Sequence, residues 1–392
     1  MSRMKRATRR GSLSVGAAVA STALLLSACG AGEQTVKADP AAAAQSSDGV
    51  AKAKEMMAAL QGNPEWPDVK KIDKPVNLTG KKFTYVALGD QIPVIHGLGV
   101  GVTEALSAAG AQVKICDGKF NPTAVAECLK SAGDEGVDGV VTAFIDYQMA
   151  GPAFDALAKK GVKVILGGVA PSGGRQADAS LAFYDNTERV TALYEAMSAS
   201  AIAQGGAQTK ALWIKLMDST TTTGASEKGV AKFKELCPSC GIATAEFTTA
   251  NLDKLASSVS AALVSNPDTN TVIVPVDSFV PPAMQGIQSA KFADKVKVIS
   301  SSSDLAGLQR VKDGQQASDL GTPVLFEGWK FANAMVQLMA GQQVEKGPEF
   351  VTRDFTRANV AGLTLDAKTY LTDDWFGGGA YKDKFLTAWG VK

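Results

Sequence analysis

Polar and aromatic side chains gather in loops that follow apolar runs of the sequence. One such loop holds Asp90, Gln91, Ile95 and His96, the only histidine of the chain. Asp and Gln side chains hydrogen-bond hydroxyl or amine groups, so this loop is a candidate ligand site. His96 is alternatively a solvent-facing residue at the start of a helix. One histidine without a nucleophile and a paired carboxylate makes no catalytic triad, so no catalytic residue is predicted.

Later loops carry the same kinds of side chain. The segment 218–224 (DSTTTTG) places several hydroxyls before a helical pattern, where they cap the helix or bind a polar ligand. Tyr147 offers a stacking face with a polar tip, or is an ordinary loop aromatic. The further candidate ligand residues are Phe144, Asp146, Tyr147, Gly168, Thr221, Thr222, Asp277, Phe279, Ser302, Asp304 and Thr322.

Alternating strands and helices must position these loops. Apolar runs predict strands over 82–88, 111–115, 137–143, 162–166, 210–216, 242–247, 271–275 and 296–300. Helical periodicity covers 98–109, 123–133, 150–160, 191–204, 225–236, 252–265, 282–290 and 326–340. Such alternation implies right-handed βαβ units and parallel sheets. We therefore predict an α/β protein of two similar doubly wound domains, with ligand loops at the carboxyl ends of the strands.

The first residues have the pattern of an export signal, in which a basic stretch precedes a short apolar run. Leu26-Ser27-Ala28-Cys29 resembles the lipobox of bacterial lipoproteins, which implies cleavage before Cys29 and lipid attachment to its thiol. The alternative is an ordinary signal peptide with a coincidental cysteine. We expect a signal peptide over 1–28, and a lipidated tether and N-terminal extension over 29–79, flexible across 30–50. The protein is then extracytoplasmic and anchored to the cell membrane.

The charge and the cysteine content bear on two further questions, namely whether the protein binds nucleic acid and whether it contains disulfides. The first 28 residues hold five basic and no acidic side chains, which leaves 35 basic against 39 acidic residues. The sequence has no concentrated basic patch of the kind that binds nucleic acid, so nucleic-acid binding is not predicted. Four cysteines remain besides Cys29, and an even number outside the cytoplasm favours disulfides. Proximity suggests Cys116–Cys128 and Cys237–Cys240.

The spacing of Cys237 and Cys240 also fits a thiol oxidoreductase. This pair follows the predicted helix and does not lie at a helix N-terminus, where the dipole would lower a thiol pKa. A structural disulfide is therefore favoured. No metal site and no cofactor is predicted.

Four motifs occur in order along the chain: Asn121-Pro122, the strand 136–140 (GVDGV), the strand 161–164 (GVKV) and Asp185-Asn186. Together they resemble the type I periplasmic binding proteins of the ribose/galactose branch. The resemblance covers roughly 82–360 and points to an actinobacterial-type substrate-binding lipoprotein of an ABC transporter. It implies a monomer that captures a small molecule in a cleft and passes it to an ABC permease in the membrane. A sensory receptor of the same fold that feeds a membrane kinase is the alternative.

The resemblance also implies domain boundaries and a three-segment hinge. Domain 1 is expected at 80–185 plus 323–346, and domain 2 at 186–322 plus 347–362, followed by an appendage at 363–392. The chain is expected to cross between them at Asp185-Asn186, at 300–304 and at 321–323.

The ligand residues of the family are only partly present. Asp277 and Asp146 match its polar positions. Val94 and Ile95 stand where the family places aromatic residues, and Gly168 stands where it places an Asp-Arg pair. The family default is a small, polar, sugar-like ligand. These departures leave open an aromatic acid, an amino compound or a modified sugar.

Overall fold

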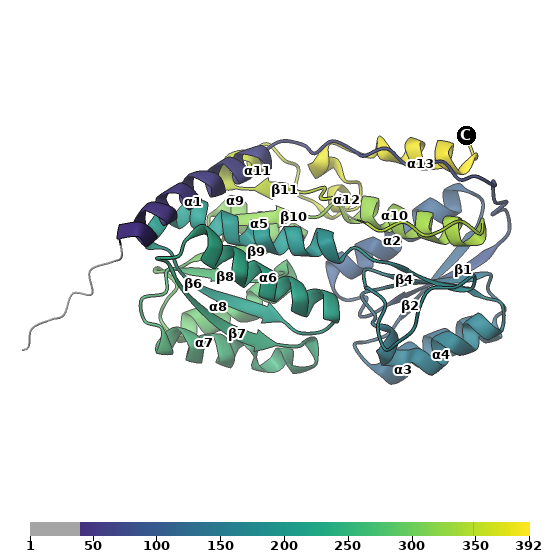
Figure 1. The fold of residues 1–392 in the computed structure, drawn as a ribbon, viewed down its shortest axis with the longest axis horizontal. Helices are drawn as coiled ribbons and strands as arrows, with labels where there is room; N and C mark the ends of the chain where they lie inside the picture. The colour runs from purple at the N-terminus through teal and green to yellow at the C-terminus, as the bar shows by residue number, and fades with distance from the viewer. Residues whose placement is uncertain (1–39, 348) are drawn as a thin grey trace, which may run out of the picture. The chain divides into compact units, whose positions relative to one another are not determined.

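The computed structural model describes residues 40–347 and 349–392. The predicted signal peptide, the lipobox cysteine and residues 30–39 lie outside this part of the chain. The described residues form two sheets with helices on their faces, which we call lobe 1 and lobe 2 (Figure 1).

Lobe 1 is built on a five-stranded parallel sheet of order β2-β1-β3-β4-β5. Its elements are β1 (Lys82–Ala87), β2 (Gln112–Asp117), β3 (Gly139–Ala143), β4 (Lys163–Gly167), β5 (Leu181–Tyr184), α2 (Pro93–Ala108), α3 (Pro122–Asp134), α4 (Tyr147–Lys159) and α10 (Val324–Met339). Neighbouring residues of β1 point to opposite faces, so Tyr85 packs in the core with α2 and α10 while Val86 packs in the core with α3 and α4. Burial on both faces explains why β3, β4 and β5 are almost continuously apolar, whereas the edge strand β2 is partly exposed and carries Lys114 and Asp117.

Lobe 2 is built on a six-stranded sheet of order β11-β10-β9-β8-β6-β7, in which only β11 runs antiparallel to its neighbour. Its strands are β6 (Lys210–Leu216), β7 (Gly241–Phe247), β8 (Thr271–Ile273), β9 (Lys297–Ser301), β10 (Ser318–Gly321) and β11 (Arg353–Phe355). Its helices are α5 (Thr187–Gly205), α6 (Thr220–Leu236), α7 (Leu255–Ser265), α8 (Val280–Ser289) and α9 (Leu305–Asp313). The two lobes are therefore α/β units of the same plan, as predicted.

The chain passes between the two sheets through β5–α5, β10–α10 and α10–β11. The predicted crossing at 300–304 is wrong. This segment joins β9 to α9, and β10 then pairs beside β9 in the same sheet. The prediction overlooked α9 and β10, which are only nine and four residues long.

Two helices begin five residues earlier than predicted, and both begin at the cleft. Helix α2 starts at Pro93, whose fixed φ and missing N–H suit the first turn. Helix α6 starts at Thr220, with Ser219 and Thr222 forming a reciprocal capping box. Part of the threonine-rich loop is therefore the first turn of a helix.

The N-terminal extension is structured where a flexible tether was expected. Residues 40–50 form the first half of α1 (Pro40–Ala59), which packs against α5 and α6 of lobe 2. The contact is close, because a Cβ atom on Gly49 would lie 1.7 Å from the carbonyl oxygen of Leu236. The hydroxyl of Ser46 also accepts hydrogen bonds from the backbone N–H and the hydroxyl of Ser239.

After α1 the chain runs to lobe 1 beside the C-terminal segment (Figure 1). Trp66 packs against Phe326 and Tyr381, and the N–H of Ile72 donates to the carbonyl of Ala388. The C-terminal elements are α11 (Arg357–Val360), α12 (Ala367–Tyr370) and α13 (Tyr381–Trp389), with short 3-10 turns at Gly206–Gln208, Thr249–Lys254, Asp277–Phe279 and Asp374–Phe376. The N-terminal and C-terminal segments thus add two further connections between the lobes.

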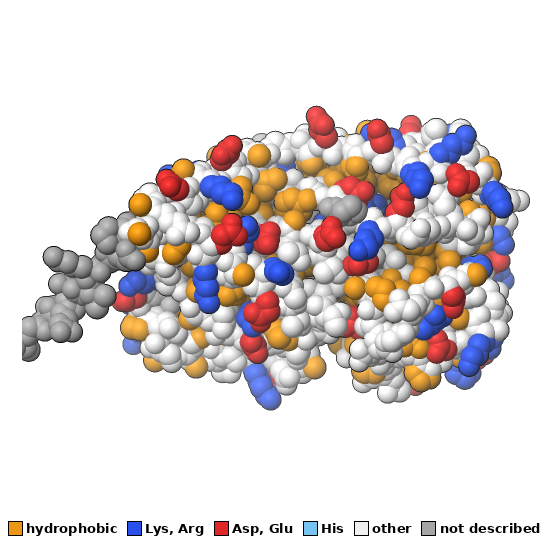
Figure 2. Space-filling view, viewed as in Figure 1, with side chains coloured by type: hydrophobic (Ala, Val, Ile, Leu, Met, Phe, Trp, Pro, Cys, Tyr) orange, Lys and Arg blue, Asp and Glu red, His pale blue; other side chains and the backbone are white. Residues whose placement is uncertain are grey.

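Both disulfides favoured by proximity are present, Cys116–Cys128 and Cys237–Cys240. The second lies at the C-terminal end of α6, where the helix dipole does not favour a thiolate. Among the described residues, no helix has the length and apolarity needed to cross a membrane. The face drawn in Figure 2 carries interspersed acidic and basic side chains, and a notch separates the lobes at its lower edge.

Candidate functional site

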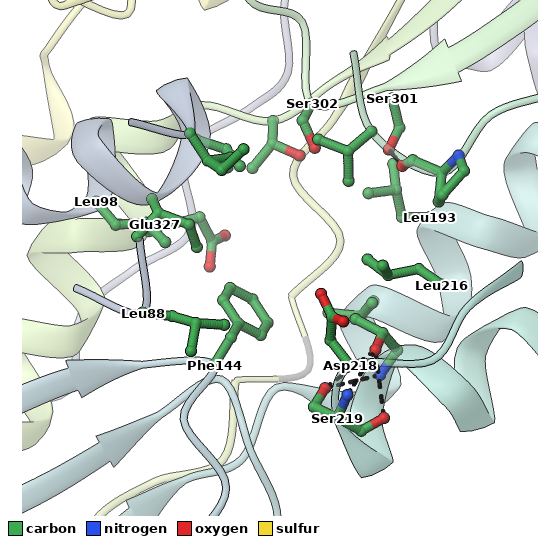
Figure 3. Close-up of a pocket in the computed structure, with 18 of the residues that line it drawn as sticks. Leu88, Leu98, Phe144, Leu193, Leu216, Asp218, Ser219, Ser301, Ser302 and Glu327 are labelled. Carbon is green, nitrogen blue, oxygen red and sulfur yellow. Dashed lines mark hydrogen bonds between the residues drawn. The ribbon is translucent and has the colours of Figure 1, made fainter. Parts of the chain in front are cut away.

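A cavity of about 100 Å³ lies between the two lobes, at the carboxyl ends of their strands (Figure 3). The loops after β1, β2, β3, β6, β7, β8, β9 and β10 line it, together with residues of α2, α5 and α10. Ligands in parallel α/β sheets bind at this edge, where strand ends leave room for loops of variable sequence. The cavity is the candidate binding site.

An ion pair across the lobes borders the cavity. Nε of Arg189 on α5 lies 3.5 Å from Oε2 of Glu327 on α10, and both side chains are buried. Lys330 Nζ lies 3.6 Å from the other oxygen of Glu327 and 3.0 Å from Glu349. Neither oxygen of Glu327 has a hydrogen-bond partner among the described residues.

Asn186 is a second incompletely paired group in the wall. Its side chain is 1% exposed, and neither its amide oxygen nor its amide nitrogen has a hydrogen-bond partner within residues 40–347 and 349–392. A buried polar atom without a partner costs about 1–3 kcal/mol. Both polar atoms of this amide are therefore available to hydrogen-bond a molecule that occupies the cavity.

Asp218 faces Glu327 across the cavity, and both carboxylates point inward (Figure 3). One oxygen of Asp218 accepts a hydrogen bond of 2.8 Å from the N–H of Thr249. Burial raises the pKa of Asp218, and the hydrogen bonds from Thr249 only partly offset that effect. The cavity therefore has a hydrogen-bond acceptor on each side, and this arrangement suits a ligand that donates hydrogen bonds.

Two phenylalanines hold unusual backbone conformations in the wall. Phe120 and Phe144 have φ of 53° and 57°, in the left-handed region that bulky residues rarely adopt. Glycines make room for their rings, since a Cβ atom would lie 2.3 Å from the Phe120 ring at Gly89 and 2.8 Å from the Phe144 ring at Gly168. Backbone strain of this kind concentrates at functional sites.

The structure distributes the predicted ligand residues over three places. Six line the cavity: Ile95, Phe144, Thr222, Phe279, Ser302 and Thr322. Four line an open groove of about 710 Å³ between α2, α9 and the segment 365–371: Asp90, Gln91, His96 and Asp304. The other five, outside both, are Asp146, Tyr147, Gly168, Thr221 and Asp277.

The residues in the groove point away from the cavity because α2 begins at Pro93. Its first turn sends Ile95 to the cavity and His96 to the groove, where Nδ1 lies 3.1 Å from Oδ1 of Asp90. Asp304 caps α9 through the N–H of Gly307, and burial and the nearby Asp277 raise its pKa to about 6.

Each of the five remaining residues forms a hydrogen bond with another part of the protein. Asp277 is 1% exposed and accepts hydrogen bonds from the Ser300 hydroxyl and the N–H of Asp304, so it holds lobe 2 loops together. The hydroxyl of Tyr147 donates to Oδ2 of Asp155 at 2.8 Å.

The other three residues join the lobes at the edge of the cavity. Oδ2 of Asp146 accepts a hydrogen bond of 3.0 Å from the N–H of Thr220, and its Oδ1 accepts one of 3.3 Å from the Thr220 hydroxyl. The hydroxyl of Thr221 donates to the carbonyl of Gly168 at 3.1 Å.

Sequence reasoning missed several residues of the cavity wall. Arg189 lies one helical turn after the Asp185-Asn186 motif, and that spacing was the available signal. Asp218 is the first residue of the threonine-rich segment 218–224 but was not among the predicted ligand residues. Glu327 gave no signal, because only the docking of α10 brings its carboxylate to the cavity.

Residues 83–343 match the family described as a periplasmic binding protein domain. No curated protein sequence matches the chain. Solved structures share the fold. The Caulobacter myo-inositol binding protein bound to myo-inositol has a TM-score of 0.61 at 19% identity, over 72% of this chain and 95% of that one.

Two further structures show the same fold. The 5-methylthioribose transporter solute binding protein of Thermotoga lettingae, in complex with 5-methylthioribose, has a TM-score of 0.64 at 13% identity, over 83% of this chain and all of that one. A Mycobacterium smegmatis protein in complex with β-D-fucofuranose has a TM-score of 0.60 at 16% identity, over 74% and 96%. With its two α/β lobes and the match over residues 83–343, the chain belongs to the periplasmic binding protein family, whose members bind solutes and are not enzymes.

Proposed function

We propose that this protein is an extracytoplasmic receptor, anchored to the membrane through lipidated Cys29, that captures a small solute and delivers it to an ABC importer. One observation carries the proposal. The cavity wall is shared between two lobes, so a bound ligand contacts both and favours the arrangement in which they are closed.

Contacts between the lobes support a closing mechanism. The Arg189–Glu327 ion pair and the hydrogen bonds from Thr220 and Thr221 join lobe 2 to lobe 1 around the cavity. They exist only when the lobes are together, so each stabilises the closed form. An importer that recognises the closed form then distinguishes loaded from empty receptor.

A small sugar or polyol is the ligand class that the similar structures favour. Their described ligands are myo-inositol, 5-methylthioribose and fucofuranose. The cavity of about 100 Å³ is smaller than an engineered cavity of ~150 Å³ that holds benzene, so its size limits the ligand to one small ring.

The test of solute capture is thermal unfolding of the processed protein, purified from membranes of its host, against sugars, deoxy sugars, polyols, amino compounds and aromatic compounds. A solute at 100 times its dissociation constant stabilises the folded state by about 2.7 kcal/mol, which raises Tm by several degrees. Small-angle X-ray scattering with the same solute should show a more compact protein. If no solute changes either Tm or the scattering, the protein is not a solute receptor.

Lipid anchoring and transport need separate tests. The protein should incorporate labelled palmitate and sediment with membranes, and Cys29→Ser should do neither. Cells without the gene should lose uptake of the solute that raises Tm, and the gene should restore it. Uptake that continues without the gene would contradict delivery to an importer.

A further inference from the structure

The cavity wall is apolar around most of its circumference. Leu88, Leu98, Leu193, Leu216 and Phe144 surround the space drawn in Figure 3. They come from both lobes and from the ends of different strands and helices, so the apolar lining is a property of the closed site as a whole. A ligand hydroxyl facing such a wall loses its hydrogen bonds to water and gains none.

The polar side chains of the wall lie between apolar ones and include hydroxyls such as Ser302 and Thr322. Two of the three charged side chains among the described wall residues are carboxylates. Asp218 and Glu327 point into the cavity from opposite sides. Arg189 is the one cationic side chain among the described residues of the wall. Its Nε lies 3.5 Å from Glu327 but has no hydrogen-bond partner there. An anionic ligand would therefore meet the carboxylate of Asp218, which has no ion-pair partner among the described residues, and would compete with Glu327 for Arg189, which disfavours it.

The buried amide of Asn186 adds one donor and one acceptor without protein partners within residues 40–347 and 349–392. Together with Asp218, Glu327, the Nε of Arg189 and the wall hydroxyls, it marks the places where a ligand can form hydrogen bonds. The bonding groups of the ligand must then lie on a limited part of its surface, while the rest contacts leucine and phenylalanine side chains.

We propose, resting on the proposed function as a solute receptor, that the cavity binds a neutral or amine-bearing ring compound with one apolar, deoxygenated face or substituent. The ligand donates hydrogen bonds from its polar edge to Asp218 and Glu327. Fully hydroxylated sugars and polyols bind weakly, because several of their hydroxyls would be buried without partners. Carboxylic acids are excluded by charge.

The experiment compares matched pairs of probes by thermal shift and calorimetry on the unmodified processed protein. One pair is D-fucose and D-galactose, which differ in a single hydroxyl. A second is 5-methylthioribose and ribose. A third is 4-hydroxybenzyl alcohol and 4-hydroxybenzoate, which differ in charge. We expect the first member of a pair that binds to have a dissociation constant at least about tenfold lower than the second, since a buried unpaired hydroxyl costs about that much.

The outcomes separate this inference from the proposed function. If D-galactose, ribose or myo-inositol binds as tightly as the deoxygenated probes, the inference is wrong and the receptor function stands. If 4-hydroxybenzoate binds more tightly than the alcohol, the inference is also wrong. If neither the deoxygenated nor the hydroxylated solutes bind, the inference and the receptor function both fail.

A variant tests whether the apolar wall causes the preference. Leu216→Asn places an amide in the wall and should reduce the preference for the deoxygenated member of each pair. Val264→Asn is the matched control, because Val264 is 67% exposed and lies outside the cavity. A folded Leu216→Asn protein with an unchanged preference would contradict the role of the wall, and the probe ranking on the unmodified protein remains decisive if the variant does not fold.

Discussion

At the scale of single residues, Asn186 and Asn121 show how the same side chain serves two purposes. Asn121 caps α3 by accepting hydrogen bonds from the N–H groups of Thr123 and Ala124. Asn186 stands at the start of α5 but makes no such bond, and its amide lies buried at the cavity. The first residue therefore stabilises the fold, whereas the second has no hydrogen-bond partner among the described residues and is proposed to bind the ligand.

This difference predicts opposite results for two alanine substitutions. Asn121→Ala should lower the free energy of unfolding by about 1 kcal/mol, because a helix cap is lost, and leave ligand affinity unchanged. Asn186→Ala should leave the stability of the free protein unchanged or higher and weaken ligand binding about tenfold or more. Urea unfolding and calorimetry measure the two quantities. A destabilised Asn186→Ala protein with normal affinity would show that Asn186 is structural.

Asp373 is a buried carboxylate whose titration affects stability. Burial raises its pKa to about 6, although Oδ2 accepts hydrogen bonds from the Tyr381 hydroxyl and the N–H of Phe326. In the unfolded chain an aspartate titrates near pH 4. Between pH about 4 and 6 the folded state therefore keeps a proton that the unfolded state has released. Stability falls as pH rises through this window and stays lower above it.

We predict that Tm increases when the pH is lowered from 7.5 to 5. Asp304 and Asp354 act in the same direction, because burial also raises their pKa values to about 6. Asp373→Asn should flatten this dependence and raise stability at pH 7.5 by on the order of 1–2 kcal/mol, since each pKa unit corresponds to about 1.4 kcal/mol. Asparagine also tolerates the φ of 57° at this position.

Thermal unfolding at both pH values measures the effect. Asp253→Asn, at an exposed position, is the control and should leave the pH dependence unchanged. A protein that is less stable at pH 5 than at pH 7.5 would contradict the prediction.

At the scale of elements, α1 shows that a composition rich in alanine, serine and glycine does not by itself produce a flexible tether. Alanine favours a helix, and a partner surface on α5 and α6 supplies the burial that an isolated helix lacks. Ala53 and Met57 are buried in the core of lobe 2. The extension is therefore part of the lobe and not only a connection to the membrane.

Two glycine substitutions test the docking of α1. Gly49→Ala should gain helix propensity but push α1 away from Leu236, so Tm should fall and amide exchange across residues 40–59 should accelerate. Gly224→Ala in α6 has the same propensity gain and no atom within 4 Å of the new Cβ, so Tm should stay the same or rise. Equal effects of the two substitutions would show that α1 does not pack closely on α6.

At the scale of the whole described molecule, few direct polar contacts hold the lobes together at the cavity rim. Asp146 stands at the start of α4 in lobe 1 but does not cap that helix. Its carboxylate instead accepts hydrogen bonds from Thr220, the first residue of α6 in lobe 2. Negative charge at a helix N-terminus is favourable, so this contact stabilises the closed arrangement.

We predict that Asp146→Ala weakens ligand binding about threefold to tenfold, as expected for the loss of one or two partly exposed hydrogen bonds. The Tm of the free protein should change little, because both residues lie at the surface of their lobes. Calorimetry measures affinity, and small-angle scattering measures closure with ligand. Asp253→Ala, at an exposed position of lobe 2, is the control. An unchanged affinity in Asp146→Ala would exclude a role of this contact in closure.

The sequence alone determined the fold class and the edge of the sheets where the cavity lies. Both follow from local properties. Apolar runs and helical periodicity depend only on neighbouring residues, and parallel sheets place their ligand loops at the strand ends. Phe144 and Ser302 follow strands directly, so they could be chosen without the structure, and both line the cavity.

The tertiary structure decided which side chains face the ligand space. Helix α2 begins at Pro93, and the resulting rotation turns His96 to the outer groove and Ile95 inward. Glu327 reaches the cavity only because α10 returns to lobe 1 and docks against α2, where Gly101 and Gly328 allow close approach of the helices. The position of Glu327 depends on packing between segments more than 200 residues apart in the chain, and no local pattern of the sequence encodes it.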